Sequence, residues 1–353
     1  MQDTVKPLVI GNLVAKIPII QGGMGVGISL SSLAGTVAAE GGVGVISTAQ
    51  IGFKEEGWLK NPIETNLLAI GKQIGLAKEK AKGGIVGVNI MVATKYYEKY
   101  VKAAVKAGVD LIISGAGLPV SLPEYVKGTL TKIAPVISTE KAARVICKLW
   151  DRKSQRAPDL LIVEGPEAGG HLGFTYDEVI ATDAATYDKE IQKIIEVAKE
   201  FGNKFKKKIP VVVAGGIDNK EKMKHYLELG ADGVQVATSF VTTKECDAPD
   251  SYKQAYINAK KKDIVLVKSP VGMPGRAIRN KFIDAVNQGK KFPVQCKNCI
   301  SMCNHKDIPY CITDALVNAA RGNIDDALVF CGANAYKAAK ITTVREVIKG
   351  FIG

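Results

Sequence analysis

The stretch Pro210-Val-Val-Val-Ala-Gly-Gly-Ile217 decides the fold, because it joins an uninterrupted apolar run to two glycines. An apolar run without alternation is typical of a parallel strand that is covered on its outer face by helices. Similar runs recur through the first two thirds of the 353-residue chain. The predicted strands are Ile17–Met24, Val43–Thr48, Ile85–Val92, Leu111–Gly117, Ile133–Thr139, Asp159–Gly165, Pro210–Gly216 and Gly233–Phe240.

Amphipathic segments of helical length separate most of these runs. Examples are Tyr96–Ala107, Glu140–Trp150, Lys189–Phe201 and Asn219–Leu229. The alternation predicts an α/β fold, and eight such units fit a closed (β/α)8 TIM barrel better than an open sheet. Several runs end in glycine, so we expect a ligand to approach the backbone closely at the carboxyl ends of the strands.

Two regions depart from the repeating pattern. The widest spacing between strands contains Gly52–Lys82, which we interpret as an insertion or a lid over the barrel of residues 1–240. After residue 240 the alternation stops, and helix-like pieces occur at Ser251–Lys261, Asp314–Ala320 and Val344–Phe351. We predict that residues 241–353 form a Cys-rich helical extension packed on the barrel.

The composition limits the classes of partner. The formal net charge of +13 comes from Lys-rich stretches such as Lys204–Lys208, which we interpret as solvated helix ends and loops. We therefore expect no nucleic acid as a partner. The chain opens without the apolar segment of a signal peptide, and no later apolar run approaches the ~20 residues of a membrane helix. We expect a cytoplasmic protein without membrane contact. A homodimer is possible from the sequence.

The last two predicted strands carry a candidate phosphate site. Ala214-Gly-Gly-Ile-Asp218 and Gln235-Val-Ala-Thr-Ser-Phe240 end neighbouring strands. Main-chain N–H groups at glycines can reach a phosphate, and the hydroxyls of Thr238 and Ser239 can complete its shell. A tight turn alone would also explain the two glycines at 215 and 216. The prediction of a phosphate site therefore depends on both segments occurring together.

His171 is the candidate catalytic residue. It follows Gly169-Gly170 and precedes Gly173, in a loop directly after the sixth predicted strand. Such glycines favour exposure of the imidazole to a ligand, and the ordinary pKa of histidine suits proton transfer. Glu167 is a weaker second candidate in the same loop.

Four cysteines are crowded near the C-terminus. Cys296, Cys299, Cys303 and Cys311 lie within sixteen residues and are candidate thiolate ligands of an iron–sulfur cluster or a zinc ion. Reduced structural cysteines are the alternative interpretation.

Six segments carry a recognisable pattern: Ile19-Ile-Gln-Gly-Gly-Met-Gly25, Gly87-Val-Asn-Ile-Met91, Ser114-Gly-Ala-Gly117, Glu164-Gly-Pro-Glu-Ala-Gly-Gly-His-Leu-Gly173, Pro210-Val-Val-Val-Ala-Gly-Gly-Ile217 and Gly230-Ala-Asp-Gly-Val-Gln-Val-Ala-Thr238. Taken together, they resemble the nitronate monooxygenase family, formerly called 2-nitropropane dioxygenases, whose superfamily also contains the FMN-dependent enoyl-acyl-carrier-protein reductase II.

The resemblance implies an FMN-binding barrel with the flavin over the carboxyl ends of the strands. His171 matches the family's active-site histidine. The residues implied in cofactor binding are Gly22, Gly23, Met24, Asn89, Glu164, Gly170, Gly215, Gly216, Ala237 and Thr238.

The resemblance implies oxidation of alkyl nitronates with O2 to a carbonyl compound and nitrite. The alternative is FMN-dependent reduction of an enoyl thioester by NAD(P)H, with acyl carrier protein or a coenzyme A thioester as partner. The region Cys296–Cys311 is absent from the family pattern, and an iron–sulfur centre there would favour a reductase.

Overall fold

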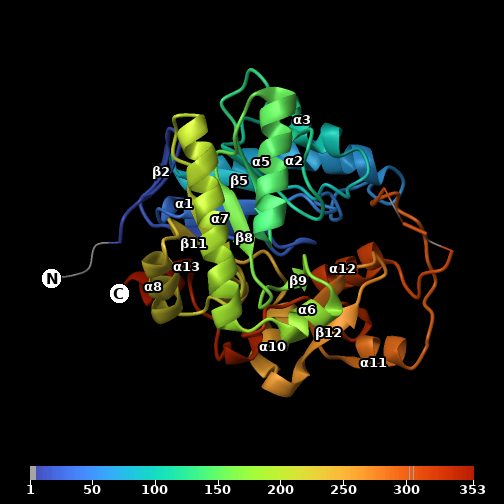
Figure 1. Ribbon diagram of the computed structural model, residues 1–353. Coiled ribbons are helices and arrows are strands. Elements are labelled where there is room, and N and C mark those ends of the chain that lie inside the picture. The colour runs from blue at the N-terminus through green and yellow to red at the C-terminus, as the bar shows by residue number, and fades with distance from the viewer. Residues whose placement is uncertain (1–4, 302, 305) are drawn as a thin grey trace.

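A closed barrel of parallel strands forms the centre of the molecule, and the computed structural model describes residues 5–301, 303–304 and 306–353 (Figure 1). The first strand pairs with the last, Ile19 opposite Val234, which closes the sheet on itself. The predicted α/β barrel is therefore confirmed. Its strands are β3 (Ile19–Gln21), β4 (Val43–Ser47), β5 (Ile85–Asn89), β6 (Leu111–Ser114), β7 (Lys132–Ile137), β8 (Leu161–Glu164), β10 (Val211–Ala214) and β11 (Gly233–Val236).

The strands are shorter than the apolar runs that predicted them. In the first run only Ile19–Gln21 lies in the sheet, and Gly22–Met24 leaves it. In the seventh run Gly215 and Gly216 follow the strand with positive φ values of +103° and +69°. These glycine segments form the loops above the carboxyl ends of the strands, because they turn the chain out of the sheet.

A ring of helices covers the outside of the barrel. In α5 the residues Ala143, Ile146, Cys147 and Trp150 are buried on one face, and Thr139 caps the helix by accepting a hydrogen bond from the Ala142 N–H. The ring consists of α1 (Ser31–Ala39), α2 (Pro62–Ala81), α3 (Tyr97–Lys106), the short α4 (Leu122–Tyr125), α5 (Glu140–Ser154), α7 (Ala184–Lys204), α8 (Lys220–Leu229) and α13 (Val344–Ile352).

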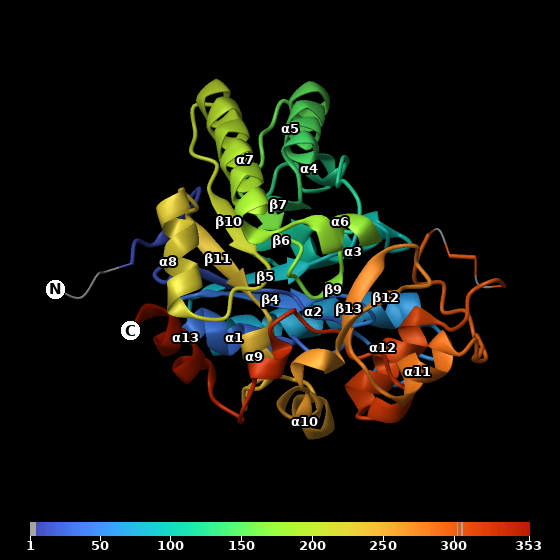
Figure 2. The ribbon, with the colours of Figure 1, turned by 60° about the horizontal axis from the view of Figure 1, so that its bottom comes forward.

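The last helix of the ring comes from the C-terminus. Strand β11 is followed only by the single turn α9 (Thr238–Val241), and α13 contacts both α8 and α1 (Figure 2). Residues 242–343 thus lie between the eighth strand and the helix that completes the ring. The division of the chain at residue 240 stays a prediction.

The predicted insertion or lid at residues 52–82 contains α2. This helix packs against α1, α3 and β5, and its Ile70 and Ile74 are buried in the main core. Residues 62–81 therefore belong to the outer ring. A lid function for residues 52–61 stays a prediction, although Trp58 is buried there and donates to Gln50 Oε1.

A second core fills the inside of the barrel. The hairpin of β1 (Leu8–Ile10) and β2 (Leu13–Ala15) closes the end where the strands begin, and it adds Leu8 and Ile10 to this core. With one end closed by apolar side chains, only the opposite end can hold a ligand.

The segment between α9 and α13 contains a sheet that the sequence did not predict. Strand β13 (Pro274–Ile278) pairs with β12 (Ile264–Lys268) on one side and with β9 (Gly170–His171) on the other. The remaining elements are α6 (Tyr176–Ala181), α10 (Asp250–Asn258), α11 (Lys281–Asn287), α12 (Ile312–Arg321) and the turns Lys261–Asp263, Ile324–Asp326 and Ala335–Lys337. Among the helices described, none is long and apolar enough to cross a membrane.

Candidate functional site

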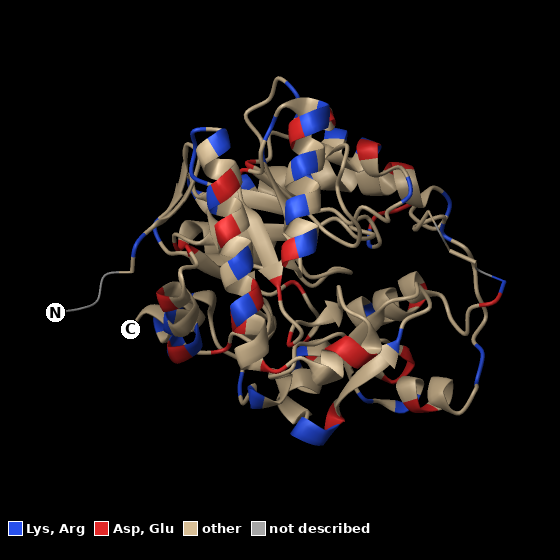
Figure 3. Ribbon diagram, in the orientation of Figure 1, with Lys and Arg blue, Asp and Glu red and all other residues tan. Residues whose placement is uncertain are grey.

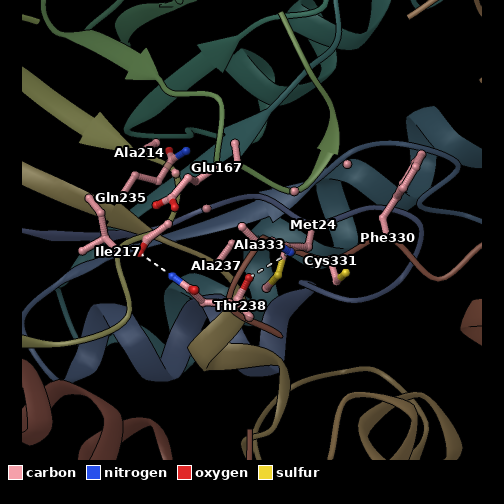
Figure 4. A pocket seen from close by; sticks show the side chains of 18 of the residues that line it. Met24, Glu167, Ala214, Ile217, Gln235, Ala237, Thr238, Phe330, Cys331 and Ala333 are labelled. Carbon is pink, nitrogen blue, oxygen red and sulfur yellow. Dashed lines mark hydrogen bonds between the residues drawn. The ribbon is translucent and has the colours of Figure 1, made fainter. Parts of the chain in front are cut away.

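Two adjoining cavities lie above the carboxyl ends of the barrel strands. The smaller measures about 170 Å³ and the larger about 470 Å³. They share Gly23, Gly25, Glu164, Gly169, Gly170 and Phe330 as lining residues, so they form two compartments of one site. Figure 4 shows the smaller compartment, with Phe330 at one side and Gln235 and Ile217 at the other.

The smaller cavity is bounded by the barrel and by the segment around residue 332. Thr238 Oγ1 accepts a hydrogen bond from the Gly332 N–H at 3.2 Å, and Asn334 Nδ2 donates to the Gly216 carbonyl at 2.9 Å (Figure 4). These two bonds fasten the C-terminal segment to the predicted phosphate loops. The cavity is therefore enclosed by residues far apart in the sequence.

Glu167 lies at the edge of the smaller cavity. Its carboxylate forms an ion pair of 3.1 Å with Lys222, whose ammonium also donates to the Gly216 carbonyl at 2.7 Å. The side chain is half exposed, so the pair contributes little stability. Its position against Gly216 separates Glu167 from the imidazole of His171, which lines only the larger cavity.

His171 lies in the larger cavity and is held by residues of the segment 242–343, which we call the inserted segment. It forms β9 with Gly170, and Gly275 of β13 is its partner in the sheet, so its backbone is ordered rather than part of a flexible loop. Its Nε2 is 2.7 Å from Ser269 Oγ, and its ring makes a T-shaped contact with the ring of Phe330, with the two ring centres 4.9 Å apart. Burial lowers the pKa of His171 to about 4, so the imidazole is neutral at pH 7.

Glu164 lines both cavities at the end of β8. Burial raises the pKa of this carboxyl to about 7. The Tyr187 hydroxyl donates to the Glu164 main-chain carbonyl at 2.8 Å, which fixes the end of the strand. Glu164 is thus a second ionisable group that lines the larger cavity with His171, and a pKa of about 7 means that it changes its protonation state near neutral pH.

The structure brings the predicted cofactor-binding residues together. Asn89 lines the larger cavity. The other nine line the smaller one: Gly22, Gly23, Met24, Glu164, Gly170, Gly215, Gly216, Ala237 and Thr238. Their roles in binding stay predictions.

Several residues of the site were missed in the sequence. Tyr252 and Tyr256 of α10 both donate to the Phe330 carbonyl and line the smaller cavity with Cys331. Ser269, the partner of His171, also belongs to the inserted segment. The only local signal was the spacing of the two tyrosines on one helix face, which does not indicate what the face contacts.

The structure does not show the predicted metal site in the part of the chain that it describes. No three His, Cys, Asp or Glu side chains there are arranged to hold a metal ion, and residues 302 and 305 lie outside the description. Cys299 lines the larger cavity, whereas Cys296 is exposed and Cys311 is buried at the start of α12. Metal binding by the four cysteines stays a prediction.

The sequence and the fold are both similar to those of known proteins. A probable nitronate monooxygenase of Staphylococcus saprophyticus is 27% identical over 79% of this chain and 80% of its own. One from Staphylococcus aureus is 24% identical over 77% and 78%.

Solved structures share the fold. FabK from Thermotoga maritima has a TM-score of 0.72 at 24% identity, covering 99% of this chain and 94% of its own. A nitroalkane oxidase from Streptomyces ansochromogenes has a TM-score of 0.72 at 18% identity, covering 95% and 94%. At these identities the likeness concerns the fold alone. The sequence pattern described as nitronate monooxygenase matches residues 6–352, and the chain belongs to that family.

Proposed function

We propose that this chain is an FMN-dependent nitronate monooxygenase, which oxidises alkyl nitronates with O2 to a carbonyl compound and nitrite. The observation that carries the proposal is the pair of joined cavities, one lined by glycines and Thr238 and the other by His171. A flavin needs an enclosed site for its phosphate next to open space for a substrate over its ring, and this arrangement offers both.

The residues present fit FMN. Gly215 and Gly216 leave the backbone bare at the smaller cavity, and both have positive φ values that residues with a side chain rarely adopt. Gly215, Gly216 and Thr238 would hold the phosphate, while Gly22, Gly23, Met24, Asn89, Glu164, Gly170 and Ala237 would surround the rest. FMN supplies the electron transfer between substrate and oxygen.

His171 would bind and orient the nitro group at its imidazole. Because burial keeps the ring neutral, it can also accept the α-proton where the substrate enters as a neutral nitroalkane. Ser269 holds the ring through Nε2, and Phe330 restricts its rotation. The surrounding apolar side chains exclude water from the reacting atoms.

Enoyl-thioester reduction is the second candidate. The larger cavity has room and apolar surface for an acyl chain, and the wall formed by Val271, Ile300 and Leu316 favours such a ligand. In that case NAD(P)H would reduce FMN, and an acyl carrier protein or coenzyme A would present the substrate.

Flavin absorption distinguishes the two. Under anaerobic conditions, a nitronate should reduce the flavin of the purified protein and NADH or NADPH should not, and in air the nitronate should yield nitrite. Bleaching by NADPH alone would overturn the proposal in favour of the reductase.

Three further expectations belong with the proposal. An iron–sulfur cluster or zinc ion at Cys296, Cys299, Cys303 and Cys311 is tested by metal analysis of anaerobically prepared protein, and less than one equivalent of iron and of zinc contradicts it. A cytoplasmic location and a homodimer stay predictions. No step of the reaction above uses a metal.

A further inference from the structure

The larger cavity contains no positive charge from the residues that the structure describes. Its lining includes neither lysine nor arginine, and its ionisable side chains are Glu164, His171, Tyr100 and Cys299. Burial lowers the pKa of His171 to about 4 and raises that of Glu164 to about 7. At neutral pH the protein surface of the cavity is therefore neutral or partly negative.

Cations close to the cavity in the fold are engaged elsewhere. Arg276 donates to the main-chain carbonyls of Pro166 and Ala168, and it lines neither cavity. Lys297 donates to Gln295 at 2.7 Å, and Lys95 to Asn298 at 3.1 Å. Other lysine and arginine side chains lie on outer helices such as α5 and α7, where they are interspersed with carboxylates (Figure 3).

Apolar side chains from the inserted segment form much of the wall. Val271, Met273, Ile300 and Leu316 all line the larger cavity. The loop around Ile300 is fastened to the barrel, since the Ser301 N–H donates to the Ala93 carbonyl and the Lys95 N–H to the Cys299 carbonyl. Part of a bound substrate is therefore surrounded by hydrocarbon.

We propose that the cavity selects nitronates with an uncharged alkyl chain and rejects those whose chain carries a second negative charge. This inference rests on the proposed function. The charge of the nitronate itself is placed at the flavin and His171, whereas a carboxylate at the far end of the chain would lie against the apolar wall, with no cation among the described residues that line the cavity. Each buried methylene, by contrast, favours binding roughly fourfold.

A pair of substrates of equal shape tests the inference. Propionate 3-nitronate and 3-methylbutyl nitronate differ in that an isopropyl group replaces the carboxylate. With the flavin-loaded enzyme, we expect kcat/KM to favour 3-methylbutyl nitronate by about tenfold or more, as a difference of one buried charge allows. Equal or better use of propionate 3-nitronate would overturn the inference while leaving the proposed function intact.

Met273 offers a matched pair of variants. It is half-buried at the cavity, so a lysine of similar length can place its ammonium toward the substrate. Met273→Lys should shift the ratio toward propionate 3-nitronate about tenfold, and the neutral Met273→Gln should not. An equal shift in both variants would contradict a charge effect.

Dissociation constants distinguish a failure of the proposed function from a failure of the charge preference. If neither nitronate is turned over, the proposed function fails, and the dissociation constants of both compounds, measured by anaerobic flavin absorption, still decide the charge preference. Tighter binding of 3-methylbutyl nitronate supports the preference, and equal or weaker binding overturns it. The wild-type ratio stands as a test even if Met273→Lys fails to retain flavin.

Discussion

The barrel and the inserted segment contribute to the same site in different ways. The barrel supplies glycines and Thr238 at the ends of consecutive strands, where parallel topology alone brings them together. The inserted residues 242–343 supply Met273 and Phe330 to the larger cavity and Ser269 to His171, and the pairing of β13 with β9 is one of the contacts that bring this segment to the barrel. The difference separates a scaffold that holds the cofactor from a wall that determines what enters beside it.

A change in the barrel scaffold should have the largest effect. A Cβ at Gly44 in β4 would lie 1.7 Å from the main-chain oxygen of Ala34 in α1, which cannot move without separating the helix from the sheet. We expect Gly44→Val to destabilise the protein by roughly 4 kcal/mol or more, measured by denaturant unfolding.

Gly71→Ala in α2 is the matched control. No atom lies within 4 Å of its added Cβ, so the change should be neutral or stabilise by about 0.5–1 kcal/mol through helix propensity. A similar loss of stability in both variants would contradict the steric explanation, because the replacement of glycine lowers the entropy of the unfolded chain and by itself stabilises the folded state.

His171 follows a barrel strand, whereas Ser269, its hydrogen-bond partner, belongs to the inserted segment. His171→Ala should lower kcat by roughly 10²–10⁴-fold while flavin content is retained, because the flavin site depends on other residues. Ser269→Ala removes one hydrogen bond to the ring and should lower kcat by about tenfold or less. Steady-state kinetics and flavin absorption measure both.

The comparison requires His171→Ala to lower kcat more than Ser269→Ala. If Ser269→Ala is as damaging as His171→Ala, the inserted segment contributes directly to the chemistry and the division into scaffold and wall is wrong. Unchanged turnover in His171→Ala would remove this residue from the mechanism.

The smallest effect concerns Glu164, which belongs to both compartments. Burial raises its pKa in the folded protein to about 7, from an ordinary value of 4.5. A raised pKa means that the folded state holds the proton more tightly than the unfolded state, so the resulting stability is complete below about pH 4.5 and is lost as pH rises through 7.

Thermal unfolding measures this contribution. The melting temperature of the flavin-free protein should fall between pH 5 and 8 by a few degrees more than that of Glu164→Gln, which cannot ionise. Between the same limits His171 adds the opposite trend at the acidic end, because its lowered pKa resists protonation. Parallel curves for both proteins would show that Glu164 is not desolvated.

The sequence by itself determined the barrel and the residues at its strand ends. The eight apolar runs were sufficient to predict the barrel, because each strand of a parallel barrel is buried on both faces. Each strand can therefore be identified from its own residues alone. The same holds for Gly215, Gly216 and Thr238, whose positions follow from the order of the strands.

Only the tertiary structure decided the rest. The pairing of β13 with β9 and the bond between Ser269 and His171 join residues that lie about a hundred positions apart. Such contacts leave no local period, since each depends on where the inserted segment returns to the barrel. The neutral state of His171 likewise follows from its burial, because desolvation is a property of the assembled cavity and not of the residues beside it in the chain.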